Sequence, residues 1–344
     1  MKAILIPDFV SDPSTLQPTS TPIPTPKPNQ CLVRITYCSP QHADILHAQG
    51  KHQNNNKKRG WCFPPFVLGF DFAGEVVNSP RNGDVNTSAV FKKGDRVFGA
   101  ALGAFAEYVC VDVQAIRKIP AALSDETACA MSGQAVSYAS VVHIAKIKPG
   151  ETVMVSGASG GLGSVCCMVA KALGAKVIAL SGSADKISTI RETIGADLVL
   201  EMEGDWIEQV MGFTQGKGVD VMLDNTGMVN DAIRALAYFG RIVILGFAAR
   251  KGVMEDVKMN KLLLKSVTVM GYRFGESGRR YPDELKKIWE GYLRMLETGQ
   301  LKAPLYGKYT GLEDIGRALK DLEERRVCGK IVVKVASENE TARL

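Results

Sequence analysis

The sequence predicts an α/β protein in which a doubly wound parallel sheet is inserted into a mainly β, barrel-like domain. Two patterns carry this prediction. Residues 31–113 hold short, strand-like segments that are rich in β-branched side chains and separated by glycine turns. From Ser124 onward, apolar strand-like segments alternate with helical patterns, which is typical of a parallel sheet with helices on both faces.

The β part is predicted from the period of its apolar side chains. Residues 31–37 alternate between apolar and polar positions, as a half-buried strand does. Residues 67–77, 96–99 and 105–113 are the next strand candidates. Residues 11–30 are rich in Pro, Ser and Thr, so we expect an extended surface segment there and not a linker between domains.

The second part begins with a helix start signal. Ser124 is a favoured N-cap residue, and Asp125 and Glu126 place negative charge in the first turn of a helix that is predicted to reach Ala145. Strands are predicted over residues 152–156, 176–180, 198–200, 219–224, 241–245, 267–271 and 329–335. Helices are predicted over residues 162–173, 185–194, 282–298 and 312–325. We therefore assign residues 124–272 to the parallel-sheet domain, and expect the other domain to combine residues 1–123 and 273–344.

A glycine-rich turn, Gly157 to Gly163, follows the first strand of the parallel sheet. Glycine lets the backbone turn tightly and lets a pyrophosphate approach main-chain N–H groups. The helix that follows begins with orphan N–H donors and partial positive charge, which suit a phosphate. Because a second strand follows at the expected distance, we predict a dinucleotide phosphate site at Ser159, Gly160, Gly161 and Leu162.

The end of the second strand of this sheet indicates which dinucleotide binds. Proteins that prefer NAD usually place Asp or Glu there, to bond the ribose hydroxyls. This chain instead has Ser181 and Ser183, with Lys186 close behind. Two hydroxyls and a lysine suit the 2′-phosphate that NADPH carries on its adenosine ribose and NADH lacks. NADPH is therefore the predicted cofactor.

Bulk composition argues against several other classes of protein. The chain has 344 residues and a net charge of +6, and its basic residues form no stripe interleaved with aromatics, so we expect no nucleic-acid partner. No apolar run approaches the length of a membrane span, and the apolar stretch at the N-terminus is interrupted by Pro7 too early for a signal peptide.

The eight cysteines form no C-x-x-C pair, which favours buried thiols in a reducing, cytoplasmic setting. The residues Ala342-Arg343-Leu344 also resemble a peroxisomal address.

Several segments carry a resemblance that runs nearly from end to end: residues 64–76, 93–97, 103–109, 155–163, 224–227, 240–243 and 329–333. Together they resemble the zinc-independent quinone oxidoreductase and enoyl reductase branch of the medium-chain dehydrogenase/reductase superfamily. The resemblance implies a Rossmann-type domain inserted into a GroES-like domain. It implies hydride transfer from NADPH to a small conjugated acceptor: a quinone, an enone, or an α,β-unsaturated carbonyl or thioester. It also implies a homodimer, since relatives pair the sheet edge predicted at residues 266–272 across a two-fold axis.

The resemblance also argues against a metal site. Zinc alcohol dehydrogenases of the superfamily bind catalytic zinc through Cys, His-Glu and a second Cys, but the corresponding residues here are Gln41, Phe70-Asp71 and Ser132. A catalytic zinc needs three protein ligands and an open position. We therefore expect no metal, and a zinc-type alcohol dehydrogenase stays the alternative that a metal assay would reveal.

Four residues are candidates for the catalytic site. Gln41, Asp44 and His52 would face the nicotinamide from the barrel domain, and Tyr272 would add an apolar wall. His52 is the candidate for proton delivery, because histidine titrates near neutral pH. Relatives often have Asn in place of Gln41 and Tyr near His52, so the substrate is not fixed by the resemblance.

The nicotinamide itself is expected at the ends of two later strands. Asn225 follows one of them, and Gly246 and Phe247 follow the next. Ligands of parallel sheets bind outside the carboxyl ends of the strands, so these three residues should flank the ring. A further alternative is a non-catalytic NADPH-binding structural protein, because the superfamily also includes lens proteins.

Overall fold

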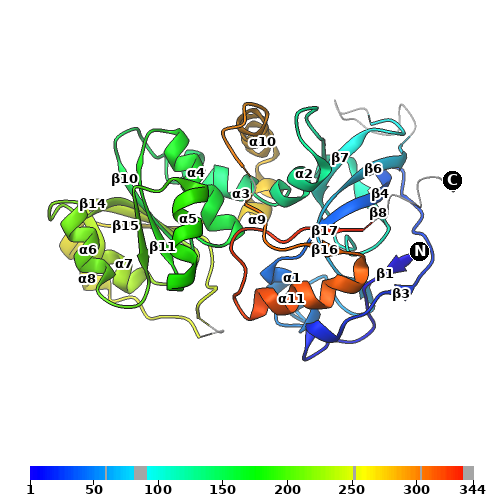
Figure 1. Cartoon of the computed structure of the whole chain (residues 1–344), viewed down its shortest axis with the longest axis horizontal. Coiled ribbons are helices and arrows are strands. Elements are labelled where there is room, and N and C mark those ends of the chain that lie inside the picture. Colours follow the sequence, from blue (N-terminus) through cyan, green and yellow to red (C-terminus); the bar gives the residue numbers. More distant parts are fainter. Residues whose placement is uncertain (59, 81–90, 251–252, 303, 336–344) are drawn as a thin grey trace. The chain divides into compact units, whose positions relative to one another are not determined.

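The computed structural model describes residues 1–58, 60–80, 91–250, 253–302 and 304–335 (Figure 1). The chain forms two compact units. Unit 1 comprises Met1–Gly133 together with Leu305–Leu344, and unit 2 comprises Gln134–Pro304. The parallel-sheet part is therefore inserted between two stretches of the mainly β part, as the predicted fold class states.

Unit 1 is built on a mostly antiparallel sheet with the strand order β16-β17-β4-β6-β7-β9, and β8 also pairs with β4. The strands are β4 (Gln30–Ser39), β6 (Asp71–Asn78), β7 (Arg96–Ala100), β8 (Tyr108–Asp112), β9 (Ile116–Lys118), β16 (Tyr309–Thr310) and β17 (Val333–Lys334). Two short ladders join β1 (Lys2–Ala3) to β3 (Thr19–Ser20), and β2 (Leu5–Ile6) to β5 (Phe66–Val67). The helices of this unit are α1 (His42–Ala48), α2 (Asp125–Met131) and α11 (Ile315–Glu323).

Unit 2 holds a parallel sheet with the strand order β12-β11-β10-β13-β14-β15. The strands are β10 (Thr152–Ser156), β11 (Lys176–Ser181), β12 (Leu198–Glu201), β13 (Val219–Asp224), β14 (Leu236–Ile244) and β15 (Thr268–Gly271). The helices are α3 (Ala135–Ala139), α4 (Gly161–Ala172), α5 (Ile187–Ile194), α6 (Trp206–Phe213), α7 (Val229–Ala235), α8 (Met259–Lys265), α9 (Phe274–Arg280) and α10 (Pro282–Glu297). In Figure 1, α4 and α5 cover one face of this sheet, and α6, α7 and α8 cover the other. From β10 the strands β11 and β12 are added on one side of the sheet, whereas β13, β14 and β15 are added on the other. The ligand-binding crevice of a parallel sheet lies at such a switch point, which is here next to β10.

The helix predicted from Ser124 to Ala145 is interrupted. Ser124 caps α2 as expected, since its hydroxyl accepts the Thr127 N–H at 3.1 Å. α2 ends at Met131, and α3 and a π-helical turn, Ser140–Ile144, follow after a break. The break contains Gly133, where a Cβ atom would lie 2.8 Å from a carboxylate oxygen of Asp71, so only glycine lets the chain pass so close.

The divisions of the chain differ from the boundaries expected at residues 123 and 272. α2 packs against β4 and β6, which keeps it in unit 1. α10 packs against α3 and α9, which keeps the segment before Leu305 in unit 2. The closing strand is shorter than the predicted 329–335, because Gly329 adopts a left-handed φ of +95° and only Val333–Lys334 pair as a regular strand.

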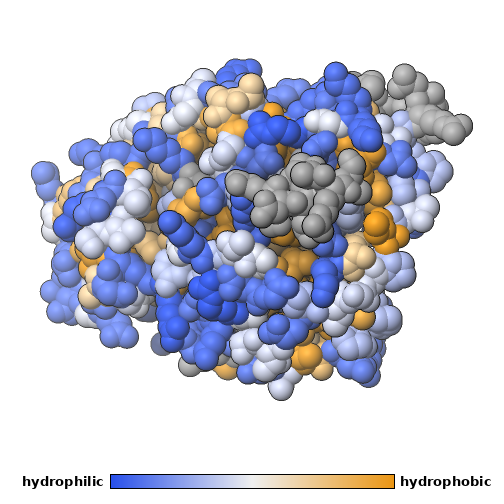
Figure 2. Space-filling model, turned by 45° about the vertical axis from the view of Figure 1, so that its right-hand side comes forward, coloured by the Kyte–Doolittle hydropathy of each residue, from blue (hydrophilic) through white to orange (hydrophobic). Residues whose placement is uncertain are grey.

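Each unit has its own apolar core. Residues at the centre of unit 1 include Ile4, Ile35, Leu68, Phe72 and Phe105, and those of unit 2 include Met154, Ile178, Leu180, Met222 and Ile242. Fully burying such a side chain contributes about 1.5–3 kcal/mol. The face drawn in Figure 2 is mostly hydrophilic, and its hydrophobic areas are small and separate. Within the described ranges, none of the helices has the length and apolarity that a membrane span requires.

Candidate functional site

The glycine-rich turn joins β10 to α4 in a tightly packed arrangement. Gly157 has a φ of +61°, and the Ala158 N–H donates to the Leu180 carbonyl of β11 at 3.0 Å. A Cβ atom on Gly163 would lie 2.3 Å from the Gly157 carbonyl oxygen, so the helix approaches the turn only because residue 163 is glycine. Gly160 is the N-cap of α4 and contributes no side chain, so the first N–H groups of this helix remain available to a phosphate.

The predicted phosphate-site residues lie together on this turn. Ser159, Gly160, Gly161 and Leu162 are all half-buried, and they lead directly into the first turn of α4. An anion placed there would meet backbone N–H groups and the positive end of the helix dipole. The arrangement therefore fits the pyrophosphate of a dinucleotide.

The end of β11 presents hydroxyls and no carboxylate. Ser181 is its last residue, and the Ser181 hydroxyl donates to the Ser183 carbonyl at 2.9 Å. Lys186 closes a short 3-10 turn, Ala184–Lys186, and is only 8% exposed. The first acidic residue, Asp185, is exposed on that turn and not at the strand tip.

Asn225, Gly246 and Phe247 meet at the carboxyl ends of β13 and β14. The Gly246 N–H donates to the Asp224 carbonyl, and the Ala248 N–H donates to the Asn225 carbonyl, each at 3.2 Å. The Asn225 side chain donates from Nδ2 to the Ser156 carbonyl at 2.9 Å, while its Oδ1 is buried and has no partner among the described residues. A buried oxygen left in this state fits a site whose ligand supplies the donor. Phe247 is 48% exposed beside it.

Two polar residues of this region were not predicted as site residues. Ser156 ends β10 and Asp224 ends β13; both are buried, and they are joined by hydrogen bonds to each other and to Thr226, which was expected beside the nicotinamide together with Asn225. Ser156 and Asp224 are polar residues at the tips of two otherwise apolar strands. That feature is visible in the sequence and could have identified them.

Gln41 and Asp44 lie together at the start of α1 in unit 1. Asp44 is fully buried, and its Oδ2 accepts the Gln41 backbone N–H at 2.9 Å, while Oδ1 has no partner within the described part of the chain. Burial raises the pKa of the Asp44 carboxyl to about 8; the nearby charge of Asp71 adds to the rise, whereas the Gln41 N–H and Lys330 oppose it. Asp44 therefore holds Gln41 in place, and its raised pKa favours the protonated carboxyl.

His52 lies against a second histidine that the prediction did not single out. The rings of His47 and His52 stack with centroids 4.0 Å apart, and His47 also packs against Phe70. The Asn54 N–H donates to His52 Nδ1 at 3.1 Å, so the neutral His52 ring carries its proton on Nε2. Burial, with a smaller contribution from His52, lowers the pKa of His47 to about 4.

Tyr272 follows β15 in unit 2. Its N–H donates to the carbonyl of Ile244, the last residue of β14, at 3.1 Å. Tyr272 therefore lies beside the end of β14, and Gly246 follows Ile244 by two residues. Its ring meets Phe274 edge-on, with centroids 6.3 Å apart. Burial raises the pKa of the Tyr272 phenol to about 12, so the hydroxyl stays protonated.

One of the positions that correspond to zinc ligands, Asp71, forms a buried ion pair. Lys330 donates to Asp71 Oδ2 at 3.2 Å, and both side chains are buried. Ser132 donates its hydroxyl to the Cys129 carbonyl at 2.8 Å. Within residues 1–335, apart from the stretches that the structure does not describe, no three His, Cys, Asp or Glu side chains are grouped to hold a metal ion.

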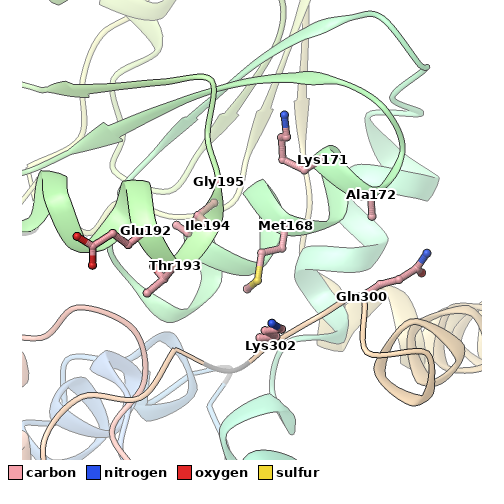
Figure 3. A pocket seen from close by; sticks show the side chains of 9 residues that line it. All are labelled: Met168, Lys171, Ala172, Glu192, Thr193, Ile194, Gly195, Gln300 and Lys302. Carbon is pink, nitrogen blue, oxygen red and sulfur yellow. The ribbon is translucent and has the colours of Figure 1, made fainter.

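A groove of about 530 Å³ lies elsewhere in unit 2, along the second half of α4 and the end of α5 (Figure 3). Its polar lining includes Lys171, Glu192, Gln300 and Lys302. Figure 3 shows the tips of Lys171, Glu192 and Gln300 pointing in different directions, and Lys171 is already paired with Asp197 at 3.0 Å. The polar groups of this groove therefore do not converge on a common point.

A parallel sheet with a glycine-rich β10–α4 turn defines a dinucleotide-binding protein of the Rossmann type. Two family models match the chain in the same order: an alcohol dehydrogenase GroES-like domain over residues 27–121, and a zinc-binding dehydrogenase over residues 161–291. The first match lies within unit 1 and the second within unit 2.

Similar proteins extend the match to nearly the whole chain. Quinone oxidoreductase-like protein 2 of Bos taurus is 32% identical over 323 residues, which cover 92% of this chain and 87% of that protein. Prostaglandin reductase-3 of Bos taurus is 30% identical over 328 residues, which cover 91% and 83%. A mycobacterial protein in complex with NADPH shares the fold with a TM-score of 0.84 at 24% identity, over 97% of this chain and 100% of that one. The chain therefore belongs to the quinone oxidoreductase branch of the medium-chain dehydrogenase/reductase superfamily.

Proposed function

We propose that the protein is an NADPH-dependent, zinc-independent reductase of a small molecule with a conjugated carbonyl, such as a quinone, an enone or an unsaturated thioester. The observation that carries this proposal is the turn from β10 to α4, where Gly163 lets the start of the helix pack against the glycine-rich turn and β11 ends in hydroxyls. The names of the relatives, a quinone oxidoreductase-like protein and a prostaglandin reductase, support the choice of acceptor.

Bound NADPH would supply the hydride, and the side chains of the protein would bind and orient it. We propose that Ser159, Gly160, Gly161 and Leu162 hold the pyrophosphate. Ser181, Ser183 and Lys186 would receive the 2′-phosphate, and Asn225, Gly246 and Phe247 would flank the nicotinamide. These assignments are supported by backbone donors at the turn, by hydroxyls at the end of β11, and by the unpartnered Asn225 Oδ1.

The four catalytic candidates differ in how deeply they are buried. Asp44 has no exposed surface, so we propose that it positions Gln41 and does not itself touch substrate. Gln41, His52 and Tyr272 are half-buried and remain candidates for contact with substrate. His52 stays the proposed proton donor, and it would act as the imidazolium, because a neutral ring whose Nδ1 accepts the Asn54 N–H is too weak an acid to release its Nε2 proton.

NADPH oxidation by the purified protein tests the proposal. The panel holds a quinone, an alkyl enone, an enoyl thioester and a simple ketone, each with NADPH, with NADH and with a chelator. We expect chelator-resistant turnover of a conjugated acceptor, with a preference for NADPH of at least about tenfold, since one charge-assisted bond to the 2′-phosphate is worth about that factor. Turnover of the ketone alone, abolished by chelator, would point to a zinc-type alcohol dehydrogenase. NADPH binding without any turnover would favour a non-catalytic role.

We propose a homodimer that pairs along β15. This strand forms one edge of the described sheet of unit 2, and an edge strand offers unpaired backbone groups to a second copy. Large apolar side chains are exposed on α8 just before β15, and Leu263 is 80% and Leu264 72% exposed.

We also propose that the protein works in the cytoplasm. The residues that resemble a peroxisomal address, Ala342-Arg343-Leu344, lie outside the described residues.

Sedimentation velocity tests the dimer. We expect a species of twice the chain mass of 37.2 kDa. Replacing both Leu263 and Leu264 by Glu should weaken association at least about tenfold, because each buried leucine contributes about 1.5–3 kcal/mol. Phe213→Glu, at an exposed apolar position of α6, is the matched control and should leave the dimer intact. A monomeric native chain, or an unaffected double variant, would contradict this interface.

A further inference from the structure

The Asp224 carboxylate lies at the end of β13 in a closely packed polar network. It is fully buried, and its Oδ1 accepts the Ser156 hydroxyl at 2.8 Å. The same oxygen accepts the backbone N–H groups of Thr226 and Gly227, each at 3.0 Å. Oδ2 accepts the Met228 N–H at 2.8 Å. One side chain therefore fixes the tip of β10 and the turn that leaves β13.

The network fixes the orientation of Asn225, although Asn225 does not touch the carboxylate. Its backbone N–H donates to the Ser156 hydroxyl oxygen at 2.9 Å, and its Nδ2 donates to the Ser156 carbonyl at 2.9 Å. Reversing the amide would set two carbonyl oxygens against each other. Asn225 Oδ1 is thus held in one direction, buried and without a partner among the described residues.

The backbone carbonyl of Asp224, and not its carboxylate, supports the segment that follows β14. Leu245 and Gly246 donate their N–H groups to the Asp224 carbonyl at 2.8 and 3.2 Å. A Cβ atom on Gly246 would lie 3.1 Å from the Asn225 carbonyl oxygen, so the two strand ends are in close contact. A displacement of residue 224 would therefore move both proposed walls of the nicotinamide site together.

We propose that Asp224 is a positioning residue, which acts through Ser156 to aim Asn225 Oδ1 as an acceptor for a donor on the nicotinamide half of the cofactor. This inference rests on the proposed NADPH site. A buried acceptor without a partner is costly, and a ligand that donates to it removes that cost on binding. The donor is either the carboxamide N–H or a ribose hydroxyl.

Fluorescence titration with NADPH tests the role of Asp224. Asp224→Asn sets an amide N–H against the Met228 N–H or against the donors at Oδ1, and so disturbs the network that directs Asn225. The Kd should rise about 10- to 100-fold, the factor expected when the donor of the bound cofactor loses Asn225 Oδ1 and stays unsatisfied. Thr226→Val is a milder variant for the case in which Asp224→Asn does not fold. It removes a hydroxyl that lies 2.9 Å from Ser156 Oγ and 3.2 Å from Asp224 Oδ1. The expected loss is about three- to tenfold.

A double variant separates positioning from general destabilisation. If Asp224 acts through Asn225, the Asp224→Asn/Asn225→Ala double variant binds NADPH no more weakly than Asn225→Ala alone. Asp321→Asn is the matched control, because Asp321 is a buried carboxylate of unit 1 that accepts the Tyr309 hydroxyl at 2.7 Å. It should lower the melting temperature and leave the Kd unchanged.

The outcomes distinguish this inference from the proposed function. If the native chain binds no NADPH, the proposed function fails. If the native chain binds and Asp224→Asn binds equally well, or if the two variants are additive, only the positioning role is overturned. Repeating the Asn225→Ala comparison with the 3-acetylpyridine analogue, which lacks the carboxamide N–H, identifies the donor. A loss confined to the natural cofactor supports the proposal with the carboxamide as donor, and an equal loss supports it with a ribose hydroxyl.

Discussion

Gly163→Val is expected to weaken NADPH binding by about 100-fold. The first atom of the new side chain would lie 2.3 Å from the Gly157 carbonyl oxygen and 2.8 Å from its carbon, and both belong to the backbone. The helix and the turn must therefore separate, which costs about 1–3 kcal/mol in a tightly packed site and moves the N–H donors away from the pyrophosphate. Fluorescence titration with NADPH measures the change directly.

Gly212→Ala is the matched control for this substitution. Gly212 lies within α6 of the same unit, and a Cβ atom there meets nothing within 4 Å. Alanine in a helix interior is favoured over glycine by about 0.8–1.0 kcal/mol, so the control should be at least as stable as the native chain and bind NADPH equally well. Native affinity in Gly163→Val would show that the pyrophosphate is not held at this turn.

Asp44→Asn is expected to make the protein more stable at alkaline pH than the native chain. The pKa of Asp44 is raised from 3.8 to about 8 in the folded state. Between these values only the folded state holds the proton. The free energy of unfolding of the native chain therefore falls as pH rises, by about 1.4 kcal/mol per pH unit from this group. Asparagine keeps an acceptor for the Gln41 N–H and does not titrate, so the variant loses this slope.

Guanidinium unfolding of both proteins at pH 5, 6, 7 and 8 checks the expectation. Comparing them at equal pH cancels the other titrating groups, among them His47, whose lowered pKa of about 4 removes stability as pH falls below its ordinary value. The advantage of the variant should grow with each step and reach several kcal/mol by pH 8. Parallel profiles for the two proteins would mean that Asp44 is already ionised at neutral pH.

Local patterns in the sequence predicted much of the fold. The strand over residues 152–156 and the strand over 219–224 appear with the predicted bounds, because both are short apolar runs followed by polar residues. The glycine-rich turn between β10 and α4 was predictable for a similar reason, since its glycines are needed by the local backbone. The interruption after Met131 was not predicted; Gly133 lies there close to the Asp71 carboxylate, and such a contact with a distant strand has no local pattern.

The candidate site was predicted less completely, for a physical reason. The position of Asn225 follows from its place after a strand, but the direction of its side chain depends on Ser156, 69 residues earlier. Asp44 could be recognised as a candidate, but not as a buried group whose neighbours include Lys330 and Asp71. Tertiary contacts of this kind have no local pattern. The sequence can identify the residue and leave its environment undetermined.

The order of elements in unit 1 has a consequence for synthesis of the chain. β17, which pairs with β4, and α11, which packs against α1, both come from the segment after Leu305. A ribosome that adds about 5–20 residues per second must therefore make all of Gln134–Pro304 before these partners emerge. At the end of that interval unit 2 is complete in sequence, whereas β4 has one neighbour still missing. Unit 2 is thus the first unit able to fold fully, and unit 1 can complete its sheet only after the last segment of the chain has emerged.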